Sequence, residues 1–463
     1  MPPTLALLIG VVFVLFAFRV YPKQGFTASR ALFWPTLWYL VVATRPVGFW
    51  LDLWGIPLPG DSGDPTDGSS IERYFFLSLT LIGFWILSRR RFDWGMALRL
   101  NTWLTALLLF MAASIIWSQY PYVSFKRYIK VLGSIVMALV VLTEEYPMES
   151  MLTVLRRCLY IHLPMSLICT RYFRHIGVSF DYSGSNESWI GIATTKNTLG
   201  QVAMLGILYF SWEIRRRWDQ QGWRNVHFIY LATAVFLLKG AADSVSMTSV
   251  AMAAFALIVF HRIQALRVQP SAVRPFVRLV FGATMVLVTF FIIHSVVVFA
   301  EDSVFGKMIT LLGRDITITD RIYIWGEVYA VAASSPIVGI GYGAFWIGRL
   351  VNIPWNANMS WVLGQAHSGY VDTYLQLGYV GMLLLAGVLF STIPKLLKTM
   401  SENFDFACLR ITLLLTIAFI NVSESTFLRG DHHLWFMMLL VLWVLPPKPA
   451  PATDLGTPLP SPR

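Results

Sequence analysis

Long apolar segments recur along this chain of 463 residues and constrain its fold more than any other feature. A helix needs about 20 mostly apolar residues to cross a bilayer. The segments predict 11 to 13 spanning helices, because the first and last are short. They lie at 4–20, 31–51, 72–88, 99–117, 127–143, 151–170, 195–213, 226–239, 245–261, 276–300, 369–392, 408–421 and 434–446. The chain is therefore predicted to be an all-α integral membrane protein, a polytopic helical bundle.

The composition favours the same class. Charged residues make up 13% of the chain, whereas a soluble domain carries about 25%. In a soluble protein the net charge of +11 would favour a nucleic-acid partner. Here we assign it to cationic loops that face anionic lipid, and we expect no nucleic acid to bind. The cysteines Cys158, Cys169 and Cys408 lie in apolar segments without metal-ligand spacing, so we expect no metal site and no disulfide framework.

The basic loops orient the chain in the membrane. If the helices alternate, the segments RRRFDW, RRRWDQQGWR and HRIQALRVQPSAVRPFVR fall on one side, which the positive-inside rule makes cytoplasmic. The acidic loop 52–71 and the long loop 301–368 then lie outside. We expect one membrane domain over 1–445, with the first apolar run retained as a helix, and a disordered, Pro-rich cytoplasmic tail at 446–463.

Several basic residues lie outside in this orientation. Lys126, Arg127 and Lys130 open one predicted helix and share a face, since they are spaced by three and four residues. A single cation at a helix end is commonly a snorkelling side chain. As a set, however, the outer cations predict a site for a strongly anionic ligand such as a diphosphate, because arginine forks match phosphate oxygens. The other members of the set are Arg171, Arg174, Lys196, Arg314, Arg321 and Arg349.

Three polar islands interrupt the apolar pattern. The first is SWIGIATTKNTLGQ (188–201), where Thr194 or Thr195 is positioned to cap the following helix. The second is GRDITITDRIYIWGEVYAVAASSPIVGIGYGAFWIGR (313–349), whose glycines allow close backbone approach but lack the Lys-Ser/Thr of a phosphate loop. The third is GQAHSGYVDTYLQLGYVG (364–381), which precedes a span. Each island alone is also compatible with a plain interfacial role.

In this order the islands resemble the bacterial O-antigen ligase and O-antigen polymerase (Wzy-type) family of membrane glycosyltransferases, over roughly residues 100–445. WIGIATTKNTLG is similar to the family's tryptophan-x-glycine…lysine-asparagine-x-leucine-glycine element. TDRIYIW…SPIVGIGYGAFW is similar to its arginine-x-x-x-tryptophan…proline-x-x-glycine-x-glycine element. AHSGYVDTYLQLGYVG is similar to its histidine-asparagine-x-tyrosine-leucine…glycine-x-x-glycine element. The segments TTKNTLG and YGAFWIGR resemble the family members found in exopolysaccharide loci rather than typical lipopolysaccharide ligases.

The resemblance has three departures. Ile190 stands where many relatives carry arginine, Thr195 where a histidine often precedes the lysine, and Ser368 where asparagine usually follows the histidine. The first two changes remove polar groups from the expected donor site. Either Lys196 or the face of Lys126, Arg127 and Lys130 would then supply the missing charge.

The resemblance implies a GT-C-like membrane fold with the long outer loop between the last two motifs. It also implies a metal-independent glycosyltransferase without a cofactor, active on the periplasmic side of the bacterial inner membrane. The donor would be a glycan on a polyprenyl diphosphate, and the acceptor a glycan or lipid-linked sugar. Membrane lipid, a flippase and a chain-length regulator are candidate partners. Ligation and polymerisation share donor and motifs, so the sequence leaves both open.

Two functions of other classes remain as alternatives. A transporter or flippase for an amphipathic polysaccharide–lipid substrate would often show internal symmetry, and no repeat is visible in the sequence. A non-catalytic scaffold of a polysaccharide export complex would tolerate substitution of the motif histidine and arginine. The glycosyltransferase therefore remains the main hypothesis.

The predicted site residues have distinct roles. His367 is the candidate base, since imidazole accepts a proton near neutral pH, and Arg321 is the candidate diphosphate clamp. Tyr370 would share a helical face with His367 if the helix already includes both. Donor diphosphate binding is assigned to Lys126, Arg127, Lys130 and Lys196, and substrate binding to Asn197, Tyr370 and Asp372.

Overall fold

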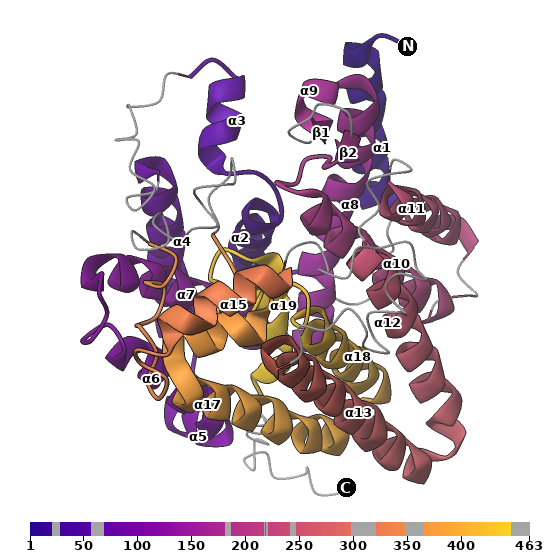
Figure 1. Ribbon diagram of the computed structural model, residues 1–463. Helices are drawn as coiled ribbons and strands as arrows, with labels where there is room; N and C mark the ends of the chain where they lie inside the picture. The colour runs from indigo at the N-terminus through magenta and orange to yellow at the C-terminus, as the bar shows by residue number, and fades with distance from the viewer. Residues whose placement is uncertain are drawn as a thin grey trace, which may run out of the picture.

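Helices make up nearly all the regular structure in the described part of the chain. The computed structural model describes residues 1–20, 28–56, 69–180, 187–216, 218, 221–240, 247–297, 321–347 and 364–445. The elements, shown in Figure 1, are α1 Pro3–Val20, α2 Phe33–Ala43, α3 Val47–Leu53, α4 Ser70–Ser88, α5 Trp94–Leu100, α6 Thr102–Ala113, α7 Pro121–Leu142, α8 Pro147–Tyr172, α9 Arg174–Gly177, β1 Val178–Phe180, β2 Glu187–Trp189, α10 Lys196–Arg216, α11 Gln221–Lys239, α12 Met247–Ala265, α13 Pro270–Val297, α15 Arg321–Ala332, α17 Gly369–Thr399, α18 Phe404–Ile420 and α19 His433–Leu442. Short 3-10 turns cover Arg30–Leu32 and Leu266–Val268.

Each predicted apolar segment contains a helix, which confirms the all-α class. Two segments differ in form. The segment 31–51 is divided into α2 and α3 at Pro46, because proline lacks an N–H and restricts the residue before it. The segment 99–117 contains α6, and α5 is bent away from it by 96°. The apolar pattern does not predict α15 or the β1–β2 hairpin, which pairs antiparallel.

Five helices in the described part of the chain are long and apolar enough to cross a membrane, or up to six if α5 and α6 form one bent span. The predicted number of 11 to 13 is not reached by this criterion. Other predicted spans are shorter, such as the 17 residues of α18, or carry more charge, as α7 does. The chain is a multi-pass α-helical membrane protein. The predicted tail 446–463 and the loop residues 301–320 and 348–363 lie outside the described residues.

The C-terminal helices form the centre of the bundle. All ten residues of α19 are buried, and α19 contacts α18, α7 and α2. By contrast, most residues of α1 are exposed, as expected of a helix that faces lipid. In Figure 1, α1 lies at the edge of the bundle and α19 near its middle. The loop that joins α18 to α19 (residues 421–432, the α18–α19 loop) is therefore held by the most buried elements of the fold.

A break in α17 brings the second and third islands together. Gly378 has φ 61° and interrupts the helix, a conformation that glycine adopts readily. The freed backbone groups pair with the glycine-rich segment. Ile340 N donates to Leu375 O at 3.2 Å, and Tyr379 N donates to Pro336 O at 2.9 Å. α15 also packs on α17, and the two lie side by side in Figure 1.

Candidate functional site

A cavity of about 600 Å³ lies between α4, α7, the second and third islands and the α18–α19 loop. Its wall is unusually charged for a membrane protein, with more basic than acidic side chains. The excess of two positive charges suits an anionic ligand. The basic residues are Arg73, Lys126, Arg127, Lys130 and Arg429, and the acidic residues are Glu72, Asp372 and Asp431.

The predicted cationic face of α7 lines this cavity. Arg127 Nη1 donates to Gly343 O in the second island at 2.5 Å. The Lys130 ammonium lies 4.0 Å from Asp431 Oδ2 and 4.5 Å from the ring centroid of Phe76. Lys126 lies against the ring of Tyr122, as an ammonium does in a cation–π contact. The structure therefore brings these three cations together at the cavity.

The α18–α19 loop supplies a part of the site that the motifs do not identify. Arg429 Nε lies 3.6 Å from Asp431 Oδ1, and Arg429 Nη1 donates to Gln365 Oε1 at 2.6 Å. The cavity wall removes part of the water around the half-exposed Asp431, which would raise its pKa, but the charges of Arg429 and Lys130 outweigh this effect and hold that pKa well below its usual range. Asp431 is therefore ionised. The sequence feature that could have identified this loop is the charged segment RGDHH, which lies between two predicted spans on the predicted outer side.

The loop is fixed to the start of α17 through Asn421. Asn421 Oδ1 accepts from the N–H groups of Thr426 and Phe427, each at 3.0 Å. Gly369 N donates to Asn421 O at 2.9 Å. A Cβ at position 369 would lie 2.0 Å from Asn421 Oδ1, so only glycine fits there. This contact sets the position of the third island relative to the loop.

His367 lies just before α17 in a strained conformation. Its φ of 53° is left-handed, which costs a non-glycine residue about 1–2 kcal/mol. Ala366, directly before it, is held on both sides: Trp325 Nε1 donates to Ala366 O at 2.7 Å, and Ala366 N donates to the Asp372 carboxylate at 3.2 Å. Such over-determined strain is typical of functional sites. The helix begins at Gly369, so the expected shared helical face of His367 and Tyr370 does not form.

Gln365 connects His367 to the charged cavity. Gln365 lines the cavity, whereas His367 does not. Because Gln365 Oε1 accepts from Arg429, its NH₂ group faces His367 Nδ1 at 3.4 Å. We infer that His367 Nδ1 is an acceptor and that the neutral ring carries its hydrogen on Nε2. A chain of contacts thus runs from His367 through Gln365 to Arg429 and Asp431.

Ser368 performs the local task expected of the asparagine it replaces. It is the N-cap of α17, where its Oγ accepts from Val371 N at 3.5 Å, and the same Oγ donates to Asn421 O at 3.2 Å. Serine and asparagine are both favoured N-cap residues. This departure therefore keeps the start of α17 intact.

Asp372 and Tyr370, both predicted to bind substrate, occupy different surroundings. Asp372 lines the cavity and accepts from Trp346 Nε1 at 2.7 Å. Tyr370 is buried, and its hydroxyl donates to Ala418 O of α18 at 2.8 Å. Its ring also packs edge-on against Phe427. Asp372 is thus a buried part of the cavity wall whose carboxylate is bonded to Trp346 and Ala366, whereas Tyr370 packs α17 against α18.

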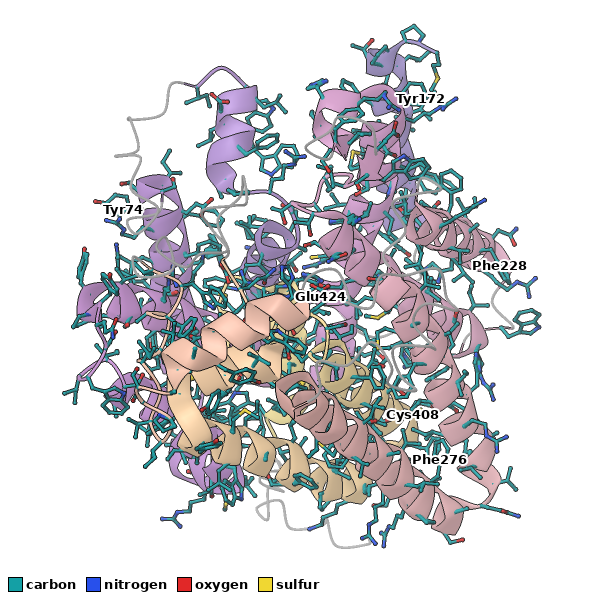
Figure 2. All side chains as sticks on the ribbon, in the orientation of Figure 1. Tyr74, Tyr172, Phe228, Phe276, Cys408 and Glu424 are labelled. Carbon is teal, nitrogen blue, oxygen red and sulfur yellow. The ribbon has the colours of Figure 1, made fainter. Side chains whose placement is uncertain are left out.

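The first island meets the α18–α19 loop rather than the cavity. Thr195 Oγ1 accepts from Thr198 N at 3.1 Å, which confirms the predicted cap of α10. Asn197 Nδ2 donates to Glu424 Oε1 at 2.8 Å. Figure 2 shows Glu424 in the middle of the molecule in this view. Lys196 is exposed at the start of α10 and does not line the cavity.

Arg321, the predicted diphosphate clamp, is the first residue of α15. Its side chain lies outside the described part of the structure. Its backbone lies one helical turn before Trp325, whose indole binds the residue next to His367. The backbone therefore places Arg321 on the element that holds the His367 segment.

The remaining predicted outer cations are separate from this cavity or outside the described residues. Arg174 pairs with Glu187 at 2.5 Å, which lowers the pKa of that carboxyl, and Arg171 is exposed. Arg314 and Arg349 lie outside the described residues. Where relatives carry arginine, Ile190 is buried. In the described part of the chain, no group of three or more His, Cys, Asp or Glu residues is placed to hold a metal ion.

Fold and cavity together define a multi-pass α-helical membrane protein with a cationic site at the ends of its helices. Residues 226–386 match the sequence model of the O-antigen ligase family. The chain is also similar to the exopolysaccharide production protein ExoQ of Rhizobium meliloti (strain 1021). The two are 25% identical over 312 residues, which cover 65% of this chain and 67% of ExoQ. These matches confirm the resemblance carried by the motifs: the chain is similar to the O-antigen ligase family and to an exopolysaccharide production protein.

Proposed function

We propose that this protein transfers or polymerises glycan units from a polyprenyl diphosphate at the outer face of the inner membrane, in the synthesis of a cell-surface polysaccharide. The family match supports a role in O-antigen or exopolysaccharide biosynthesis. The observation that carries the finer proposal is the cationic cavity joined to His367 through Gln365. This connection supports the proposal because only Gln365 separates the candidate base from cations that suit a leaving diphosphate.

The reaction follows from these groups. An acceptor hydroxyl attacks the first carbon of the donor glycan, and the bond from that carbon to the phosphate oxygen breaks. His367 takes the hydroxyl proton at Nδ1, once the acceptor hydroxyl has replaced the Gln365 amide at that nitrogen, and the polyprenyl diphosphate leaves with the bonding electrons. Arg321 and the cations of α7 stabilise the charge that grows on the leaving group. Because fixed basic side chains supply this stabilisation, the proposed reaction is metal-independent.

The cavity wall also suits a lipid substrate. Besides their charged residues, α4 and α7 contribute apolar side chains to the wall, among them Phe76, Leu77, Phe125 and Ile129. Leu77 and Phe125 are exposed on the outside of the bundle, by 41% and 50%. A prenyl chain would leave the cavity along this rim and enter the bilayer. The diphosphate would stay at the cations.

The position of the cavity supports a periplasmic site. It is lined by the first turns of α4 and α7 and by the loop after α18. In the orientation predicted from the basic loops, all three would lie on the outer side of the membrane. A flippase that delivers the donor and a chain-length regulator that limits the product are the partners this location calls for.

The test is transfer by the purified protein. The protein in nanodiscs, with EDTA present, is given a fluorescent lipid-linked oligosaccharide prepared from the source bacterium. We expect longer glycans to form, as a ladder for a polymerase or as a single addition to an acceptor lipid for a ligase. If labelled lipid crosses the bilayer of proteoliposomes and no new glycosidic bond forms, the protein is a flippase and the proposal is wrong.

A further inference from the structure

Asp431 occupies a place in the cavity where a phosphate oxygen would be expected. Its two carboxylate oxygens reach two different cations, with Oδ1 3.6 Å from Arg429 Nε and Oδ2 4.0 Å from Lys130 Nζ. Both cations line the cavity, and neither distance is short enough for a hydrogen bond. The inner-side pair of Arg216 and Glu149, by comparison, is closed at 2.6 Å. Asp431 is thus attracted to these two cations by charge rather than by a fixed hydrogen bond.

The groups involved are open to a ligand. The side chains of Asp431, Arg429 and Lys130 are 46%, 39% and 28% exposed. An anion that enters the cavity would compete with Asp431 for both cations. Arg429 also donates to Gln365, and Gln365 in turn contacts His367. Only Gln365 therefore separates the competition for Arg429 from His367.

In the proposed reaction the product carries more negative charge than the donor, so competition by Asp431 would favour product release. The donor is a diphosphate diester, whose two phosphates each carry one negative charge. Transfer leaves a diphosphate monoester, whose terminal phosphate has a second pKa of about 6 and so carries extra charge at neutral pH. A cation cluster tuned only for affinity would therefore hold the product more tightly than the donor. Such a site would be inhibited by its own leaving group.

We propose that Asp431 is an internal counter-ion that pairs with Lys130 and Arg429 in the empty site and displaces the lipid diphosphate product after transfer. This rests on the proposed function and adds product release to it. Arg429 is in turn a diphosphate-binding residue that the family motifs do not contain. Asp431 acts through these two cations, so it is a positioning residue rather than a catalytic one.

Binding of two synthetic probes to the full-length protein in detergent tests this proposal. Farnesyl diphosphate represents the product, and its glucosyl diester represents the donor. We expect Asp431→Asn to bind farnesyl diphosphate about two- to fivefold more tightly than wild type, the range of a partly exposed ion pair, and to change diester binding less. Asp431→Ser also removes the carboxylate and is expected to behave in the same way. If one of the two variants does not fold, the other still tests the proposal.

Two control variants test whether the effect depends on the negative charge and on its position at residue 431. Asp431→Glu keeps the carboxylate, and Glu149→Gln removes a carboxylate from an arginine on the inner side. Both are expected to bind the probes as wild type does. If Asp431→Asn and Asp431→Ser bind the monoester no more tightly than wild type, or tighten both probes equally, the counter-ion proposal is wrong. If wild type binds neither probe, the proposed function itself fails.

Discussion

Replacing His367 tests the proposed chemistry most directly. His367→Ala removes the imidazole while the contacts of Ala366 to Trp325 and Asp372 remain available, since they involve the Ala366 backbone. A general base contributes about 10²–10⁴-fold, so we expect transfer by the purified variant, in nanodiscs with EDTA, to fall by at least a hundredfold. Insertion and donor binding should persist. If the variant keeps more than about a tenth of the wild-type rate, His367 is not the base.

The strained backbone at position 367 provides an internal control. A left-handed φ costs alanine about 1–2 kcal/mol relative to glycine, so His367→Gly should unfold at least as late as His367→Ala in a thermal melt. An energy of that size changes an equilibrium by roughly five- to thirtyfold, less than the loss expected from removing a base. Both variants should therefore be inactive. Activity in the glycine variant alone would show that strain, rather than the imidazole, limits the alanine variant.

Three further experiments test the diphosphate clamp, the cationic face and the orientation. Arg321→Lys should lose most transfer activity, because a point charge does not replace a guanidinium fork; wild-type turnover would contradict the clamp. Arg127→Glu should weaken donor binding more than Arg216→Glu on the inner side, and equal effects would mean that the α7 cations are only interfacial. A cysteine at the exposed Ser334 should react with an impermeant maleimide from outside, whereas one at the exposed Ser401 should react only after permeabilisation. The native cysteines are buried, so their background labelling should be low. The reverse labelling pattern would invert the orientation.

Most helices were predictable because a membrane-spanning helix carries an apolar run in its own sequence. A run of apolar residues near membrane length shows the element without any knowledge of its neighbours. α15 lacks that signal: its segment RIYIWGEVYAVA mixes charged and aromatic residues. Its position depends on tertiary contacts such as Trp325 with Ala366. Periodicity within one segment carries no information about such a partner.

The site was predictable to the extent that it is local. The spacing of Lys126, Arg127 and Lys130 puts them on one helical face, and that face does line the cavity. The pairing of Lys130 with Asp431 joins α7 to a loop near the other end of the chain, so no spacing rule reveals it. Tyr370 illustrates the opposite case. Its motif position predicts a substrate contact, but α17 begins after Ser368 and turns the hydroxyl towards α18.

The α18–α19 loop explains how motifs far apart in the chain can serve one site. The first island reaches it through Asn197 and Glu424, and the third through Gly369 and Asn421. The second island joins it where the hydroxyl of Tyr342 donates to a loop carbonyl at 2.5 Å. Because buried α19 and α18 hold the loop at both ends, each motif is positioned against the same rigid support. A change in this loop should therefore disturb the alignment of all three motifs at once, although the family motifs themselves remain intact.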